Sequence, residues 1–135
     1  MGRFEILEHT ADVGIAAWGA TLEDTFEQAT RGLADICGTW SDRQGSEVTV
    51  AVTADDLEAC LVDWLNEVLW IQDSRDAVLA AVDVARVGDR GAAGRLRIAP
   101  RAEEIEGTAV KAVTYHQLEV RREGDGWFAR VFVDV

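Results

Sequence analysis

Apolar residues recur at intervals of three and four in two segments of the chain, and this spacing predicts two amphipathic helices. Before and after the first segment stand Thr21, a predicted N-cap with Asp24 in the capping-box position, and Gly38, a predicted C-cap. The apolar stripe of this helix consists of Leu22, Phe26, Ala29, Leu33 and Ile36. We therefore expect a helix that begins after Thr21, ends before Gly38 and buries one face.

The second predicted helix is longer and follows Thr53, which we interpret as its N-cap because Asp56 again stands three positions later. Its expected buried face consists of Leu57, Leu61, Trp64, Leu65, Val68 and Leu69. The acidic residues that fall largely on its other faces are Asp55, Glu58, Asp63 and Glu67. This helix should pack by its apolar face and present carboxylates to solvent.

Most of the remaining chain has the composition and alternation of β-strands. The predicted strands cover residues 3–7, 13–19, 46–52, 77–87, 94–100, 113–122 and 127–135. Connections rich in Gly and Asp at 88–91 and 123–126 predict hairpins, and therefore antiparallel pairing. The expected fold class is α+β, with a mostly antiparallel sheet covered on one face by the two helices. Because no linker or internal repeat interrupts residues 1–135, we expect a single domain.

Length and composition are those of a globular protein that can bury a core without disulfides. The chain has 135 residues, of which 48% are hydrophobic and 28% charged. Cys37 and Cys60 lie among apolar residues at helical spacing, which favours small core thiols in a reducing compartment over a disulfide. No apolar run is long enough to span a membrane, and the first ten residues do not resemble a signal peptide. We therefore expect a cytoplasmic protein.

Negative charge is concentrated in the first half of the chain. The formal net charge is −12, and residues 1–76 contain 16 acidic and 4 basic side chains, whereas residues 77–135 contain 9 of each. Strong direct binding of RNA or DNA is therefore disfavoured, because it requires a basic surface against the phosphates. Docking onto a basic protein surface is compatible with this charge, and a purely solubilising role is the alternative.

No sequence motif of high specificity for an enzyme is present, so the candidate chemistry rests on individual residues. Asp12 stands at the entrance of a predicted strand, where an aspartate commonly accepts a local backbone N–H in a turn. Asp134 stands at the end of the last predicted strand, next to Val135. Two aspartates with a main-chain or terminal oxygen would suit Ca²⁺, Mg²⁺ or Mn²⁺ if they converged, and a solvated strand end is the alternative.

Two further residues belong to the segment VKAVTYHQLEV. Lys111 is the only lysine of the chain, and a lysine in this setting is more often exposed to solvent than functional. His116 lies on a predicted strand, where a single histidine is more often a partly buried structural residue than a catalyst.

Three stretches of the chain, HTADVGIAAWG, LVDWLNEVLW and VKAVTYHQLEV…ARVFVDV, together resemble the archease family in their order and spacing. The resemblance implies an α+β domain that is not itself an enzyme. Archeases are accessory factors of the RtcB-type RNA ligase, which joins a 2′,3′-cyclic phosphate or 3′-phosphate end to a 5′-hydroxyl end in tRNA splicing and RNA repair. They promote guanylylation of the ligase, which uses GTP and metal, and support its multiple turnover.

The resemblance also implies a divalent ion, commonly calcium, held by Asp12, Asp134 and Val135. Val135 would contribute a main-chain or terminal oxygen, since its side chain has no ligand atom. Lys111 and, on a weaker match, His116 are implied as contacts that matter for activation. Gln117 departs from the family, in which a small residue is frequent at this position. His9 is interpreted as part of the scaffold.

Two other classes of function stay open from the sequence. One is a stand-alone metal-dependent hydrolase that uses the same carboxylates with His116 as general base. The other is a chaperone-like interaction module, which only the acidic helix faces suggest. Turnover of nucleotides or RNA ends without any ligase would favour the hydrolase, and loss of preference for an RNA ligase in partner capture would favour the interaction module.

Overall fold

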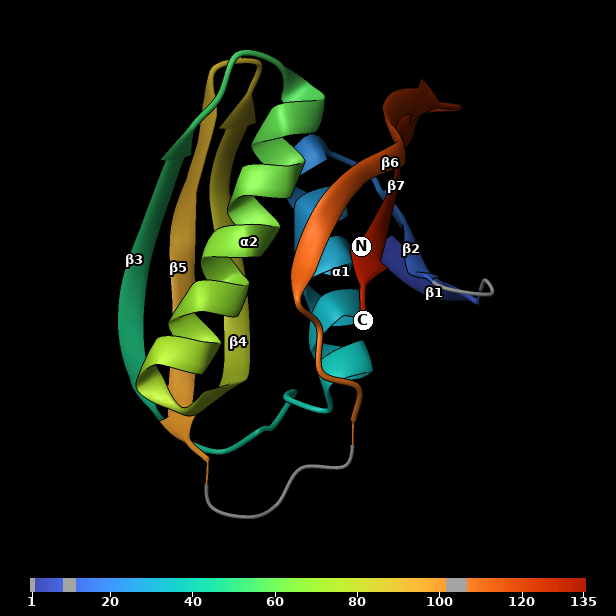
Figure 1. The fold of residues 1–135 in the computed structure, drawn as a ribbon. Coiled ribbons are helices and arrows are strands. Elements are labelled where there is room, and N and C mark those ends of the chain that lie inside the picture. Colours follow the sequence, from blue (N-terminus) through green and yellow to red (C-terminus); the bar gives the residue numbers. More distant parts are fainter. Residues whose placement is uncertain (1, 9–11, 102–106) are drawn as a thin grey trace.

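Two helices lie between two antiparallel β-sheets in the computed structural model, which describes residues 2–8, 12–101 and 107–135 (Figure 1). The helices are α1 (Leu22–Cys37) and α2 (Leu57–Arg75). The four-stranded sheet has the order β1 (Gly2–Glu8), β2 (Asp12–Gly19), β7 (Gly126–Asp134) and β6 (Ala112–Glu123). The three-stranded sheet has the order β3 (Ser46–Thr53), β5 (Gly91–Pro100) and β4 (Ala77–Gly88).

The α+β class is confirmed, and the strands form two sheets rather than the one sheet expected from the sequence. The reason lies in α2, whose buried residues point in most directions around the helix axis. They are Cys60, Leu61, Val62, Trp64, Leu65, Val68, Leu69, Ile71 and Gln72. One sheet covers only one side of such a helix, so a second apolar surface is needed on the other side. Both helices contact strands of both sheets.

The helix caps agree with the sequence for α1 and differ for α2. The Thr21 hydroxyl accepts a hydrogen bond from the Asp24 N–H at 3.0 Å, and Gly38 ends α1 with a left-handed φ of 69°, as predicted. The predicted N-cap of α2 at Thr53 is wrong, because Thr53 is the last residue of β3. Asp56 is the cap, and its carboxylate accepts from the Ala59 N–H at 2.7 Å. Asp caps at least as well as Thr, and strand pairing already uses Thr53.

One continuous core fills the space between the sheets and around the helices. Trp64, Phe26 and Ile15 are fully buried in it, and the indole N–H of Trp64 donates to the Thr30 hydroxyl at 3.0 Å. The two cysteines are free thiols, as expected. Burial raises the pKa of each thiol to about 11, so both stay protonated at neutral pH. In the described part of the chain, neither helix is long and apolar enough to cross a membrane.

Side chains from α1 hold the edge of the three-stranded sheet. The carboxylates of Glu23 and Glu27 accept hydrogen bonds from the backbone N–H groups of Val87 and Val84 on β4, at 2.9 and 2.8 Å. The two glutamates are four residues apart, so they project from the same helix face. Burial raises the pKa of the Glu27 carboxyl from its ordinary value of 4.5, and the hydrogen bond from Val84 opposes this shift. These contacts cover backbone groups through which an edge strand could pair with another chain.

Two substitutions of Glu27 should distinguish the contribution of its hydrogen bond to stability from the contribution of its negative charge. Because the raised pKa makes the folded state bind this proton more tightly, the stability that Glu27 contributes is present below pH 4.5 and is lost as the pH rises through the raised value. Glu27→Gln keeps an acceptor without the charge, so its free energy of unfolding in urea should increase relative to wild type from acid to neutral pH. Glu27→Ala should lose about 1 kcal/mol by leaving the Val84 N–H without its acceptor. Equal pH dependence of wild type and Glu27→Gln would contradict this account.

Candidate functional site

Strand pairing brings the two predicted aspartates together. In the antiparallel pair of β2 and β7, Asp12 stands directly opposite Asp134, and Val13 stands opposite Val133. Side chains of directly opposed residues project from the same face of a sheet, with Cβ atoms about 4.5–5.5 Å apart. The first residue of β2 and the last residue of β7 therefore place two carboxylates side by side at one rim of the four-stranded sheet.

Alternation along the strands decides which face of the sheet carries this pair. Val133 is fully buried and Val13 packs against the core, so both point toward the helices. Asp12 and Asp134, one residue away in each strand, therefore point to the opposite, solvent-facing side. Asp134 is exposed and Asp12 is half-buried. The pair is accessible to an ion or to a partner.

The third strand at this rim is β6, which reaches Asp134 from the other side. Ala112 is paired with Asp134, and the backbone N–H of Lys111 donates to the Asp134 carbonyl at 2.8 Å. The Lys111 side chain is exposed. Asp134 is thus held between two strands, and its carboxylate is the part left available for a ligand.

The remaining predicted site residues lie close to the rim without joining the carboxylate pair. Val135 follows Asp134 and is 37% exposed, and it could offer only main-chain oxygen. The His116 ring is exposed and meets the ring of Phe132 edge to face, with centroids 5.8 Å apart. His9 lies outside the described residues, so its scaffold role stays a prediction, as does a turn hydrogen bond made by Asp12.

The chemistry of the rim suits a hard divalent cation, but as an incomplete set of ligands. Carboxylate oxygens are the ligands that Ca²⁺, Mg²⁺ and Mn²⁺ prefer, and like charges opposite each other in a sheet repel. Within the described residues, no group of three or more His, Cys, Asp or Glu is arranged to hold a metal ion. Asp12 and Asp134 would therefore hold part of a coordination shell, and water or a partner would complete it.

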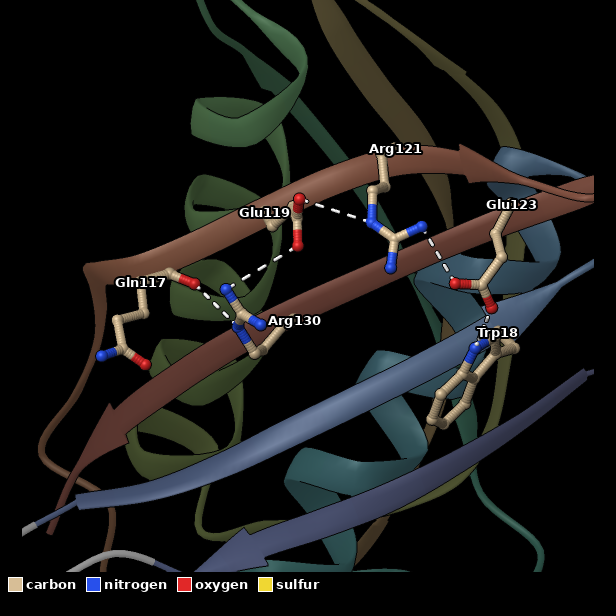
Figure 2. A network of polar contacts seen from close by, with 6 residues as sticks. All are labelled: Trp18, Gln117, Glu119, Arg121, Glu123 and Arg130. Carbon is tan, nitrogen blue, oxygen red and sulfur yellow. Dashed lines mark hydrogen bonds and ion pairs between the residues drawn. The ribbon is translucent and has the colours of Figure 1, made fainter.

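A polar network that sequence reasoning missed covers the same sheet face (Figure 2). Glu119 forms ion pairs with Arg121 at 3.4 Å and with Arg130 at 3.7 Å, and Arg121 pairs with Glu123 at 2.9 Å. Glu123 also accepts from the Trp18 indole N–H at 2.7 Å. The network joins β6, β7 and β2, the three strands that form the rim. Glu119, Arg121 and Glu123 alternate along β6, which could have indicated their shared face, whereas the contact with the distant Trp18 depends on the pairing of the strands.

A β-bulge in β6 lies between the rim and this network. The pairing of β6 with β7 shifts register between Thr114 and Glu119, and Gln117 has a left-handed φ of 50°. Its carbonyl accepts from the Arg130 Nε at 3.0 Å, which holds the bulge against β7. A left-handed residue is less strained when it is small, which accounts for the small residue expected here from the family resemblance.

A glycine of the first family stretch makes room for an aromatic ring beside the rim. The Phe132 side chain lies across Gly14, where an added Cβ would come within 2.8 Å of the ring and 3.0 Å of the Leu7 Cβ. Phe132 is only 5% exposed although it stands on the outer face, because its neighbours enclose it. Gly14 thus allows Phe132 to pack two residues before Asp134.

The fold and the rim together define a small two-sheet α+β protein with an accessible pair of carboxylates. The chain belongs to the archease family: residues 4–135 match the Archease protein family (MTH1598/TM1083). It is 34% identical to Protein archease of Methanosarcina mazei, over 98% of this chain and 96% of that protein.

Two solved structures have the same fold. Protein 1598 of Methanobacterium thermoautotrophicum superposes with a TM-score of 0.80 at 29% identity, covering 98% of each chain. An archease from Thermotoga maritima, described as a possible chaperone, superposes with a TM-score of 0.67 at 25% identity, covering 97% of this chain and 96% of that one. The predicted family is therefore confirmed.

Adding one methyl group at position 14 should destabilise the sheet beside the rim. Gly14→Ala should lose about 1–3 kcal/mol in the free energy of unfolding measured in urea, because the buried Phe132 ring has to move. Gly88→Ala is the matched control, since its added Cβ meets nothing within 4 Å. The free energy of unfolding of Gly88→Ala should equal that of the wild type or exceed it slightly. If the two variants had equal stability, the packing of Phe132 over Gly14 would not be a constraint.

Calcium should stabilise the protein through the two aspartates. We expect the melting temperature of the wild type to rise with Ca²⁺ and to return with EDTA, whereas Asp12→Asn and Asp134→Asn should show no such rise. Without Ca²⁺, each variant should be more stable than wild type by up to about 1 kcal/mol, because a like-charge pair is removed. Asp125→Asn, in the exposed turn at the other end of β6 and β7, is the control and should keep the response to calcium. If the melting temperature of Asp12→Asn rose with Ca²⁺ as much as that of the wild type, the rim would not be the calcium site.

Proposed function

We propose that this protein activates an RtcB-type RNA ligase by promoting guanylylation of the ligase and its multiple turnover, in the cytoplasm and without catalysing a reaction of its own. Membership of the archease family supports the proposal. The observation that carries it is the pairing of Asp12 with Asp134, which presents two carboxylates on an accessible rim. An exposed pair of carboxylates is available to another protein, as activation of a ligase requires.

The chemistry of the rim matches a role next to a triphosphate. A divalent cation bound there would supply positive charge where negative charge develops during nucleotidyl transfer. Asp12 and Asp134 would hold that cation, since the strands fix both carboxylates on one face. The Lys111 N–H donates to the Asp134 carbonyl, and the buried Phe132 side chain packs two residues before Asp134. The residues of this chain therefore position a ligand for the ligase rather than transform a substrate.

The net charge of −12 supports docking onto the ligase as a protein. An acidic domain is attracted to a basic surface, and such surfaces are expected on an enzyme that binds RNA. Association should therefore weaken as salt increases. The same charge disfavours strong RNA binding by this chain alone, so the RNA and the GTP are assigned to the ligase.

Two rival functions make different predictions. A stand-alone hydrolase would use the two carboxylates with His116, whose ring contacts Phe132 two residues before Asp134, as general base. A general chaperone is suggested by the description of the Thermotoga maritima archease. Turnover of nucleotides or RNA ends by the purified protein would support the first rival, and protection of unrelated proteins from aggregation, without an effect on the ligase, would support the second.

Single-turnover guanylylation of a cognate RtcB-type ligase tests the proposal directly. The wild-type protein should accelerate formation of the ligase–guanylate adduct from labelled GTP. Asp12→Ala and Asp134→Ala should fold normally and lose roughly tenfold or more of that acceleration. Lys111→Ala should lose less, because only its backbone N–H contacts Asp134. Asp125→Ala is the control and should act like wild type. Normal stimulation by both rim variants would show that the carboxylate pair is not used.

A further inference from the structure

Among the Trp, Tyr and Phe side chains that the structure describes, two are exposed to solvent. Trp70 on α2 is 62% exposed and Tyr115 on β6 is 61% exposed, while the other described Trp and Phe side chains are at least half-buried. Exposing an indole and a phenol ring to water is unfavourable, and exposed aromatic residues are enriched where proteins bind one another. Both side chains lie in segments that align with the archease family.

Helix α2 runs beside β6 (Figure 1), and we call the line of contact between them the α2–β6 seam. Trp70 belongs to α2 and Tyr115 to β6. At one end, Asp63 and Tyr115 line a groove of about 590 Å³. In the middle, the Asn66 side chain accepts from the Val113 N–H at 2.9 Å and donates to the Val113 carbonyl at 3.4 Å. At the other end, Leu69 and Val110, which directly precede Trp70 and Lys111 in the chain, line a common pocket.

The α2 side of the seam carries two carboxylates. Asp63, Glu67 and Trp70 are spaced by four and three residues, so they share one face of α2. Neither carboxylate forms an ion pair with any of the described residues. Cations stand toward the two ends of the seam: Arg90 lines the Tyr115 groove, and Arg101 lines the pocket that contains Leu69 and Val110.

We propose that this α2–β6 seam, formed by Asp63, Glu67, Trp70 and Tyr115, docks a protein partner that presents a basic surface. Trp70 and Tyr115 act as aromatic anchors, and the two carboxylates meet lysine or arginine side chains of the partner. The identity of that partner as the ligase rests on the proposed function. The seam itself is inferred from exposure, charge and position.

Two other occupants fit the observations less well. A strand added to the edge of β6 would need the backbone groups of Val113, which Asn66 already engages. A second copy of this chain would bring another acidic seam against the first, and like charges repel at a net charge of −12 per chain. A basic partner relieves this repulsion.

The seam and the carboxylate rim share strand β6 but lie on opposite sides of it. The seam is on the side of β6 that borders α2, whereas the Asp12 and Asp134 side chains point to the solvent-facing side of the sheet. The backbone links the two, since the Lys111 N–H donates to the Asp134 carbonyl. Binding at the seam and cation binding at the rim therefore use different residues, and substitutions in each should have different kinetic effects.

Titrating a cognate ligase with variants of this protein tests the assignment. Trp70→Ala and Glu67→Lys should each weaken the dissociation constant about tenfold or more, as expected for an anchor and for a charge reversal at an interface. Both should still reach the wild-type rate of guanylylation at saturation. Asp12→Asn should show the opposite pattern, with normal binding and a lower rate at saturation. Glu67→Lys should also reduce the salt dependence of binding.

Asp125→Lys is the matched charge-reversal control, since Asp125 is exposed in the turn far from the seam, and it should bind within about threefold of wild type. Circular dichroism should show that all variants are folded. Wild-type affinity of both Trp70→Ala and Glu67→Lys for the ligase would show that the seam is not the docking surface. A wild-type dimer in light scattering that Trp70→Ala dissociates would show that a second copy of this chain occupies the seam instead. A wild type that binds through the seam but does not stimulate the ligase would refute the proposed function alone.

Discussion

The pairing of β2 with β7 is the contact on which the rest of the structure depends. It joins residues 12–19 to residues 127–134, more than a hundred positions apart, with Val13 opposite Val133 on the buried face. The same register that aligns these apolar residues sets Asp12 against Asp134 on the other face. A slip of β7 by one residue would turn Asp134 toward the core and Val133 to solvent, so burial of Val133 opposite Val13 enforces the geometry of the site.

Helix α2 connects this pairing to the rest of the protein. Its apolar residues lie on most of its circumference, so it needs cover from both sheets, and its remaining face borders β6. The Asn66 side chain hydrogen-bonds the backbone N–H and carbonyl of Val113 at the edge of β6. Trp70, one turn further along the helix, stays exposed. One helix thus supplies the centre of the core, the cover for a strand edge and the most exposed indole of the described chain. The proposed docking surface exists because the helix cannot be covered completely.

Stability and function oppose each other at the rim. Two aspartates opposite each other cost free energy in the absence of a cation, and the exposed Trp70 has a similar cost in the absence of a partner. The well-packed Phe132, the ion pairs of Glu119 with Arg121 and Arg130, and the continuous core offset these costs. Such local departures from the most stable choice are expected where a protein binds something.

Local patterns in the sequence determined both helices, the Thr21 cap, most of the strands and the two hairpins, because periodicity and turn chemistry depend on neighbouring residues. They also pointed to Asp12 and Asp134 as separate candidates, and the family resemblance linked them. Only the tertiary structure decided that the strands divide into two sheets, that Asp56 rather than Thr53 caps α2, and that the two aspartates face each other. The reason is that strand partners, register and the burial of a helix on several sides are set by contacts between distant segments, which no local pattern records.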